Sequence, residues 1–175
     1  MSQLKVNSIV PVGGVASGQG GGVIQTVQSQ TTTTASNTTI TMADTNLSAS
    51  ITPTSTSNKI LVYITQSFQI KQTTAVGGGF QLLRGSTVIH KGAPTTTDGS
   101  NNVSVQLYFA NFAANANFYA YHNMHFLDSP STTSATTYKT QLAIAIAGSG
   151  REIIAQPTGT DSNGISTITL MEVSA

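Results

Sequence analysis

Two long stretches of alternating side chains, residues 117–127 and 136–147, constrain the fold of this chain most. Successive side chains of a β-strand point to opposite faces, so both stretches predict strands. In residues 117–127 both faces carry large apolar or aromatic side chains, which is typical of a strand inside a sandwich, or of one between a core and a subunit contact. We therefore expect eight side chains of the two stretches to lie in the core or in a subunit interface: Phe118, Tyr119, Tyr121, Met124, Phe126, Tyr138, Leu142 and Ile144.

Shorter alternating segments separated by turn residues fill the rest of residues 23–175. A glycine triplet at 77–79 leads into an expected hairpin, with strands 80–84 and 87–91 on either side of Gly85-Ser86. The other expected strands are 23–28, 38–42, 47–52, 59–70, 103–109, 151–155 and 165–173. Roughly nine to eleven strands at this spacing, with no amphipathic helix, predict an all-β domain: an antiparallel β-sandwich of jelly-roll type.

The first 22 residues have a different composition from the rest. Glycine occupies six of the positions from 13 to 22, and such a run reads as an extended linker. Before it lies a short segment with four apolar side chains: Leu4, Val6, Ile9 and Val12. We expect residues 1–22 to form an extended N-terminal arm whose apolar positions dock onto something other than their own domain. A frayed terminus is the competing interpretation.

The composition excludes several classes of function. Charged residues are only 7% of the chain, against about 25% in an ordinary soluble domain, so threonine, serine, asparagine and glutamine must supply its solubility. The seven basic residues are scattered and the net charge is +1, which argues against a nucleic-acid partner. No apolar run is long enough to insert into a membrane. A chain this poor in charge and rich in threonine and glycine is typical of a particle or fibre component.

Catalytic and metal-binding patterns are missing from the sequence. His122 and His125 would point to opposite faces of a strand, and His90 could join only one of them, so we expect no metal site. The six acids lie in separate segments and mark no carboxylate pair, while the serines lack a nucleophile elbow. No glycine run continues into the lysine of a phosphate-binding loop. We expect no catalytic residue and no cofactor. The five tyrosines are expected to pack in the core or an interface, with sugar stacking as the alternative.

Several segments resemble tail-fibre-like virion proteins of marine and cyanobacterial tailed phages. The opening residues 4–14 (LKVNSIVPVGG) and residues 20–27 (GGGVIQTV) resemble the start of such proteins. Similar body segments are 47–62 (LSASITPTSTSNKILV), 126–139 (FLDSPSTTSATTYK) and 168–173 (ITLMEV). These are recurring sequence features of that group and contain no catalytic motif. Residues 80–116 carry no such likeness.

The resemblance implies a non-enzymatic structural protein of the virion: a short fibre, spike or capsid decoration subunit. It implies a homotrimer whose arm attaches to other virion proteins, in the capsid or the tail, while the β-domain faces outward. The alternative is a carbohydrate-binding module that recognises a host surface glycan through loops 92–102, 110–116 and 157–164.

Overall fold

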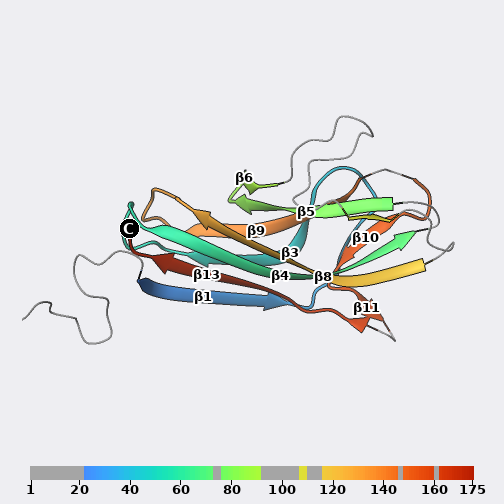
Figure 1. The fold of residues 1–175 in the computed structure, drawn as a ribbon, viewed down its shortest axis with the longest axis horizontal. Coiled ribbons are helices and arrows are strands. Elements are labelled where there is room, and N and C mark those ends of the chain that lie inside the picture. Colours follow the sequence, from blue (N-terminus) through green and yellow to red (C-terminus); the bar gives the residue numbers. More distant parts are fainter. Residues whose placement is uncertain (1–21, 73–75, 92–106, 110–115, 146–147, 160–161) are drawn as a thin grey trace, which may run out of the picture.

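The computed structural model describes residues 22–72, 76–91, 107–109, 116–145, 148–159 and 162–175. These residues form thirteen β-strands and no helix, and every strand pair is antiparallel. Two sheets pack face to face as a sandwich (Figure 1). The expected all-β antiparallel sandwich is therefore confirmed.

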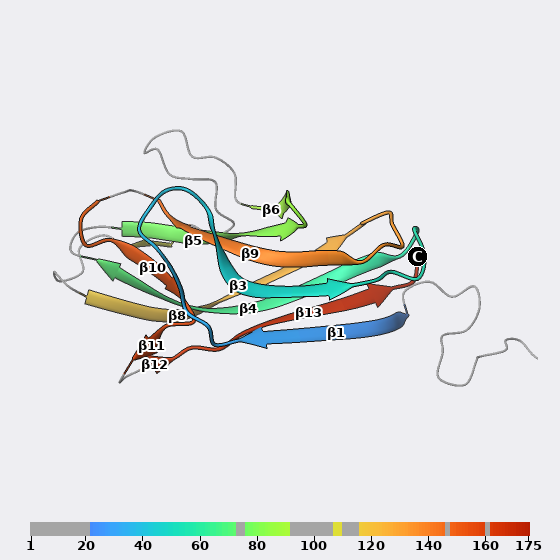
Figure 2. The ribbon, with the colours of Figure 1, turned by 180° about the vertical axis from the view of Figure 1, so that it is seen from behind.

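The first sheet is organised around its longest strand, β4 (Lys59–Gln72). One side of β4 pairs along its length with β8 (Ala116–Asp128). The other side pairs with β13 (Ser166–Val173) over the first half of β4 and with β10 (Glu152–Ala155) over the second half. Outside these two strands lie β1 (Val23–Thr31), next to β13, and β2 (Ala35–Asn37), next to β10. Figure 2 shows the start of β1 beside the C-terminus, at the far end of the sandwich from β10.

The second sheet has the order β3 (Ala43–Ile51), β9 (Thr136–Ile144), β5 (Val76–Arg84) and β6 (Thr87–His90). The short strand β7 (Leu107–Phe109) pairs with the start of β5. A separate two-residue pair, β11 (Thr158–Gly159) with β12 (Ser162–Asn163), forms within the expected loop 157–164. The predicted β5–β6 hairpin is confirmed, and Gly85 at its turn has a φ of 58°, a value that glycine adopts without a steric penalty.

The chain passes repeatedly from one sheet to the other. It crosses from β3 to β4, from β4 to β5, from β8 to β9 and from β9 to β10. The two long stretches with which the sequence analysis began, β8 and β9, therefore lie in different sheets and do not form a hairpin. The first strand pairs with the last. The jelly-roll type of the sandwich stays a prediction.

The core lies between the sheets and consists of the inward side chains of both. Phe68 of β4 and Phe80 of β5 meet across it edge to face, with ring centroids 5.6 Å apart. The large side chains with 2% exposure or less include Leu47, Ile51, Ile60, Ile64, Ile70, Leu82, Tyr138, Leu142, Ile144 and Ile153. At roughly 25 cal/mol per Å² of apolar surface removed from water, burial of such side chains is the main stabilising contribution of this fold.

A hydrogen-bonded polar layer crosses the core and joins the two sheets. The Thr140 hydroxyl of β9 donates to Oε1 of Gln66 on β4 at 2.9 Å, and Nε2 of Gln66 donates to the Ser166 hydroxyl at 2.8 Å. The hydroxyls of Thr45 and Thr140 lie 2.5 Å apart. All four side chains are fully buried, so their mutual bonds avoid the cost of burying unpaired polar groups.

Two local predictions are wrong. The expected strand at 38–42 is a turn, because the Asn37 side chain accepts a bond from the Thr39 amide and donates to the Thr41 carbonyl. The glycine triplet at 77–79 lies inside β5 instead of leading into it. A Cβ on Gly78 would lie 3.1 Å from both the Ala143 carbonyl oxygen and the Ile153 side chain, so glycine permits this close approach.

Candidate functional site: the outer face of β4 and β8

The predicted core residues divide into two groups when they are placed on the strands. Met124, Tyr138, Leu142 and Ile144 are buried, with exposed fractions of 3%, 0%, 1% and 0%. Phe118 and Phe126 are half-buried and pack against the core from β8. The predicted arm residues, Leu4, Val6, Ile9 and Val12, lie outside the described residues.

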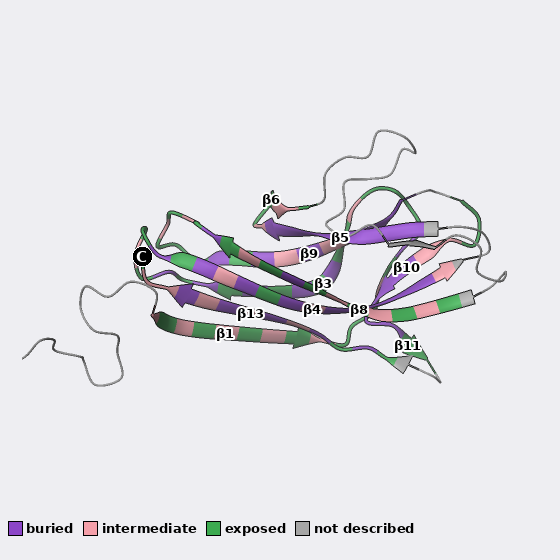
Figure 3. Cartoon of the chain, viewed as in Figure 1, coloured by how far each residue is buried: buried purple, intermediate pink, exposed green. Residues whose placement is uncertain are grey.

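Tyr119 and Tyr121 are not core residues. They point outward from β8 and are 44% and 58% exposed. Their neighbours on this side of the first sheet come from β4 and from the far end of β8: Tyr63 is 50% exposed and Leu127 is 50% exposed. Figure 3 shows the alternation of exposed and less exposed residues along β8.

We call this surface the tyrosine face and define it by Leu61, Tyr63, Tyr119, Tyr121, His125 and Leu127. In the β4–β8 register Leu61 pairs with Leu127, and Tyr63 with His125. Tyr121 and Tyr119 lie further along β8, opposite Ser67 and Gln69, beyond the hydrogen-bonded pair Thr65 and Asn123. The rings of Tyr63 and His125 stack with centroids 6.4 Å apart and an interplanar angle of 18°. The tyrosine face is thus an aromatic and aliphatic surface built on two adjacent strands.

Leu61, Tyr63, His125 and Leu127 were not among the eight predicted site residues, although Tyr63, like the other tyrosines, was expected in the core or an interface. The strand of Tyr63 alternates Ile60, Val62 and Ile64 with Leu61, Tyr63 and Thr65, and the first set is fully buried. The sequence did contain a signal for this surface. Ile60, Val62 and Ile64 already supply the core-facing side of the strand, so the large side chains of Leu61 and Tyr63 on its other side indicate a second apolar surface.

Every described carboxylate takes part in contacts that hold the fold together. Glu172 is fully buried and Asp128 is 6% exposed, each among side-chain donors. Lys139 contacts Asp44 at 2.8 Å across the β3–β9 pair. Burial alone would raise the pKa of Asp44, but hydrogen bonds from Lys139 and Gln141 and the Lys139 charge outweigh it and lower that pKa. These acids lie in separate contacts, and no pair of them converges on an open cleft among the described residues.

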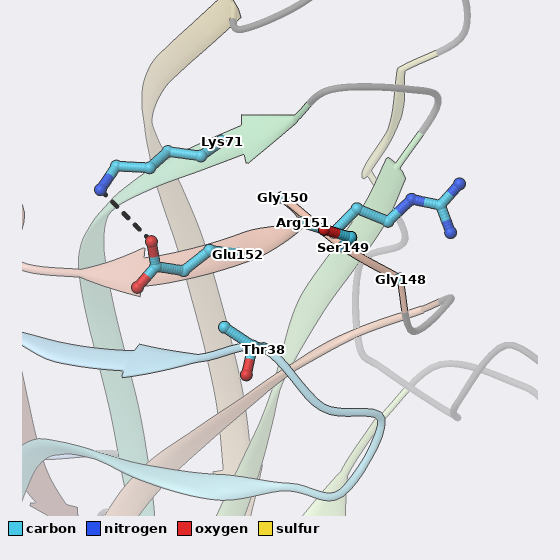
Figure 4. A pocket seen from close by; sticks show the side chains of 7 residues that line it. All are labelled: Thr38, Lys71, Gly148, Ser149, Gly150, Arg151 and Glu152. Carbon is cyan, nitrogen blue, oxygen red and sulfur yellow. Dashed lines mark ion pairs between the residues drawn. The ribbon is translucent and has the colours of Figure 1, made fainter.

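The open depression beside β10 does not have the side chains of a catalytic site. It measures about 420 Å³ and is lined by Thr38, Lys71 and residues 148–152. Figure 4 shows Lys71 paired with Glu152, at 3.2 Å, while the Arg151 side chain points away from that pair. The charge of Lys71 is thus already paired with that of Glu152, and the side chains that line the depression do not converge as catalytic groups would.

His122 and His125 point to opposite faces of β8, as their spacing predicted. His125 lies on the tyrosine face, whereas His122 points inward and stacks on Phe80 with ring centroids 5.7 Å apart. Burial, and secondly the proximity of His90, lower the pKa of His122, so its ring is neutral at pH 7. Its Nε2 has no hydrogen-bond partner among the described residues. Within that part of the chain no three His, Cys, Asp or Glu side chains gather as metal ligands.

Comparison with known proteins adds no relative. The sequence matches no family model, and no curated protein matches it. Among the residues that the structure places, no helix has the length and apolarity needed to cross a bilayer.

Glu172 makes the stability of the fold sensitive to acid. It accepts bonds from the Thr54 amide and hydroxyl, both at 2.7 Å, from Asn58 at 2.6 Å and from Gln25 at 2.5 Å. Burial opposes ionisation, but these bonds prevail and lower the pKa from 4.5 to about 2. The contacts therefore stabilise the fold fully above pH 4.5, and this contribution is lost as the pH falls toward 2.

We expect a Glu172→Gln variant to be less stable at neutral pH and to lose less stability on acidification below pH 4.5. Urea unfolding of both proteins at several pH values between neutral and about 3 measures this. Glu152→Gln is the matched control, because Glu152 is partly exposed and paired at the surface. An acid response of Glu172→Gln identical to that of the wild type would assign the pH dependence to other groups.

Proposed function

We propose that this protein is a non-enzymatic structural subunit of a tailed-phage virion: a short fibre, spike or capsid decoration protein. The observation that carries the proposal is the tyrosine face. Exposed aromatic side chains lie on the outer face of the first sheet, whereas the described carboxylates are engaged in structural contacts. A rigid β-body with an aromatic contact surface suits assembly.

The remaining parts of the proposal follow from the sequence. Residues 1–22 would attach the subunit to capsid or tail proteins, residues 23–175 would form the outward β-domain, and the subunit would be a homotrimer. The low charge of the chain supports this, since most of its polar side chains are threonine, serine, asparagine and glutamine.

The carbohydrate-binding alternative receives less support. It places host recognition in loops 92–102, 110–116 and 157–164, of which the first lies wholly outside the described residues. Residues 157–164 contain no aromatic side chain on which a sugar ring could stack. The exposed tyrosines lie on strands, away from the tips of loops.

Deleting residues 1–14 should leave the domain folded but abolish its incorporation into particles, because the apolar arm would be lost while β1 onward stays intact. The measurement is immunoblotting of purified particles after complementation with full-length or truncated protein, and circular dichroism of the truncated protein. Full-length protein that is absent from particles would refute a virion function. Truncated protein that is incorporated as well as the full-length chain would refute the anchoring role of the arm.

A further inference from the structure

We infer that the tyrosine face, together with the outer edge of β8, is the surface through which copies of this chain bind one another. The inference deepens the proposed structural function by naming the contact that a homotrimer would use. The binding partner is a second copy of the same chain. Three observations support this: the exposure of the aromatic side chains, the unprotected edge of β8 and the distribution of charge on this face.

The exposed side chains are of the kind that protein interfaces bury. Tyr63, Tyr121 and Leu127 are each at least half exposed, although their strands belong to the most regular part of the fold. Tyrosine offers a large contact area with few rotatable bonds and a hydroxyl that can hydrogen-bond at an interface rim, so it is enriched at such contacts. Met171 of β13 is paired with Leu61 of the tyrosine face and extends the same surface toward β1.

Along residues 116–127 the edge of β8 lacks the usual protection against pairing, and the one inward charge of the strand is Asp128 at its end. β8 pairs with β4 alone among the described strands, through thirteen consecutive positions from Ala116 to Asp128 without a bulge. Edge strands of monomeric proteins usually carry lysine, proline, a bulge or inward charges that prevent pairing with another chain. Residues 116–127 contain no lysine, arginine, glutamate, aspartate or proline. Such an edge is suited to being covered by a second copy of the chain in the assembled protein.

Charge favours an identical partner. On the outer face of β4, β8, β10 and β13, the charged side chains are Lys59 at one end, and Lys71 with Glu152 at the other. Lys71 and Glu152 neutralise each other at 3.2 Å. The tyrosine face between them contains no lysine, arginine, aspartate or glutamate, so two or three copies can bring the same face together without repulsion between such side chains. In a trimer, one face directed at the symmetry axis contacts both neighbours.

The structure also excludes the apolar face of β9 as a contact between subunits. The second expected apolar face, formed by Tyr138, Leu142 and Ile144 on β9, is fully used by the core of the subunit itself. On the tyrosine face, by contrast, Tyr63, Tyr119, Tyr121 and Leu127 stay 44–58% exposed.

The test is the solution mass of the full-length chain by light scattering and sedimentation velocity. We expect the wild type to be oligomeric at micromolar concentration. Tyr121→Arg should weaken association at least roughly 30-fold, because it places an unpaired cation in the centre of the contact. Tyr63→Arg, on the neighbouring strand, should do the same. Both positions are at least half exposed, so the far-ultraviolet circular dichroism spectrum should not change.

Val88→Arg is the matched control: Val88 is an exposed apolar residue of β6 in the second sheet, and this variant should keep the wild-type mass. A monomeric wild type, or tyrosine variants that keep the wild-type mass, would overturn the inference, as would a monomer that binds a neutral polysaccharide through these tyrosines. The particle experiment above is independent. Dissociation by Tyr121→Arg in a protein absent from particles would support this contact and refute the virion function.

Discussion

Replacing Leu142 with alanine should lower the free energy of unfolding by about 2–5 kcal/mol, the usual cost of removing a fully buried leucine side chain. Leu142 is 1% exposed and lies on the central strand β9 of the second sheet, where it is paired with Phe80 of β5 and Ala43 of β3. The deletion leaves a cavity between two hydrogen-bonded sheets, which cannot easily collapse to fill it. The measurement is the midpoint and slope of urea unfolding.

Ile40→Ala provides the matched control, because it removes the same number of carbon atoms from a side chain that is 44% exposed in the turn after β2. That change should alter the stability by no more than about 0.5 kcal/mol. Phe118→Ala should cost less than a full core deletion, since Phe118 is half-buried. Equal losses for Leu142→Ala and Ile40→Ala would show that β9 does not face the core as described.

Alternation in the sequence was sufficient to find the long strands and their faces. In β9, Tyr138, Thr140, Leu142 and Ile144 were expected on one face, and all four are buried. In β4 the expected strand 59–70 compares with an observed Lys59–Gln72. This worked because a period of two is a local property of the chain, and burial of one face enforces it.

Polar and glycine-rich segments were harder to predict, because competing local interactions decide their structure. The threonines at 38–41 favour a strand by propensity, but the Asn37 side chain bonds to the backbone of this segment and closes a turn. Glycines at 77–79 indicate a linker by composition, yet they continue β5 where another strand comes close. That close approach depends on residues 143 and 153, far away in the sequence.

The outward direction of Tyr119 and Tyr121 could not be read from the sequence. Both faces of β8 carry large side chains, so the pattern defines two sets without saying which one faces the core. The choice depends on the register with β4, in which Met124 pairs with Ile64 and both side chains are buried. The tyrosine face is therefore a product of long-range pairing.

Replacing Asp128 with alanine should cost about 2–4 kcal/mol, because it removes the acceptor that joins the two sheets near the end of β8. The Tyr138 hydroxyl donates to Oδ2 of Asp128 at 2.7 Å, and Nη1 of Arg84 lies 2.9 Å from both carboxylate oxygens. Without Asp128 the buried Tyr138 hydroxyl loses its acceptor, and Arg84 keeps only the Ser129 carbonyl at 3.2 Å. The cost stays below that of breaking a fully buried ion pair, since the Arg84 side chain is 30% exposed and water screens it.

A double-mutant cycle of Asp128→Ala with Tyr138→Phe isolates the hydrogen bond from the packing of the ring. Tyr138 is fully buried, and burial followed by the bond to Asp128 raises its pKa, so the hydroxyl stays protonated and donates. We expect the two changes to be non-additive by about 1 kcal/mol or more in urea unfolding. Asp128→Asn keeps one acceptor oxygen and should lose less than Asp128→Ala. Additive losses would mean that Tyr138 and Asp128 contribute independently, and that this contact does not hold the two sheets together.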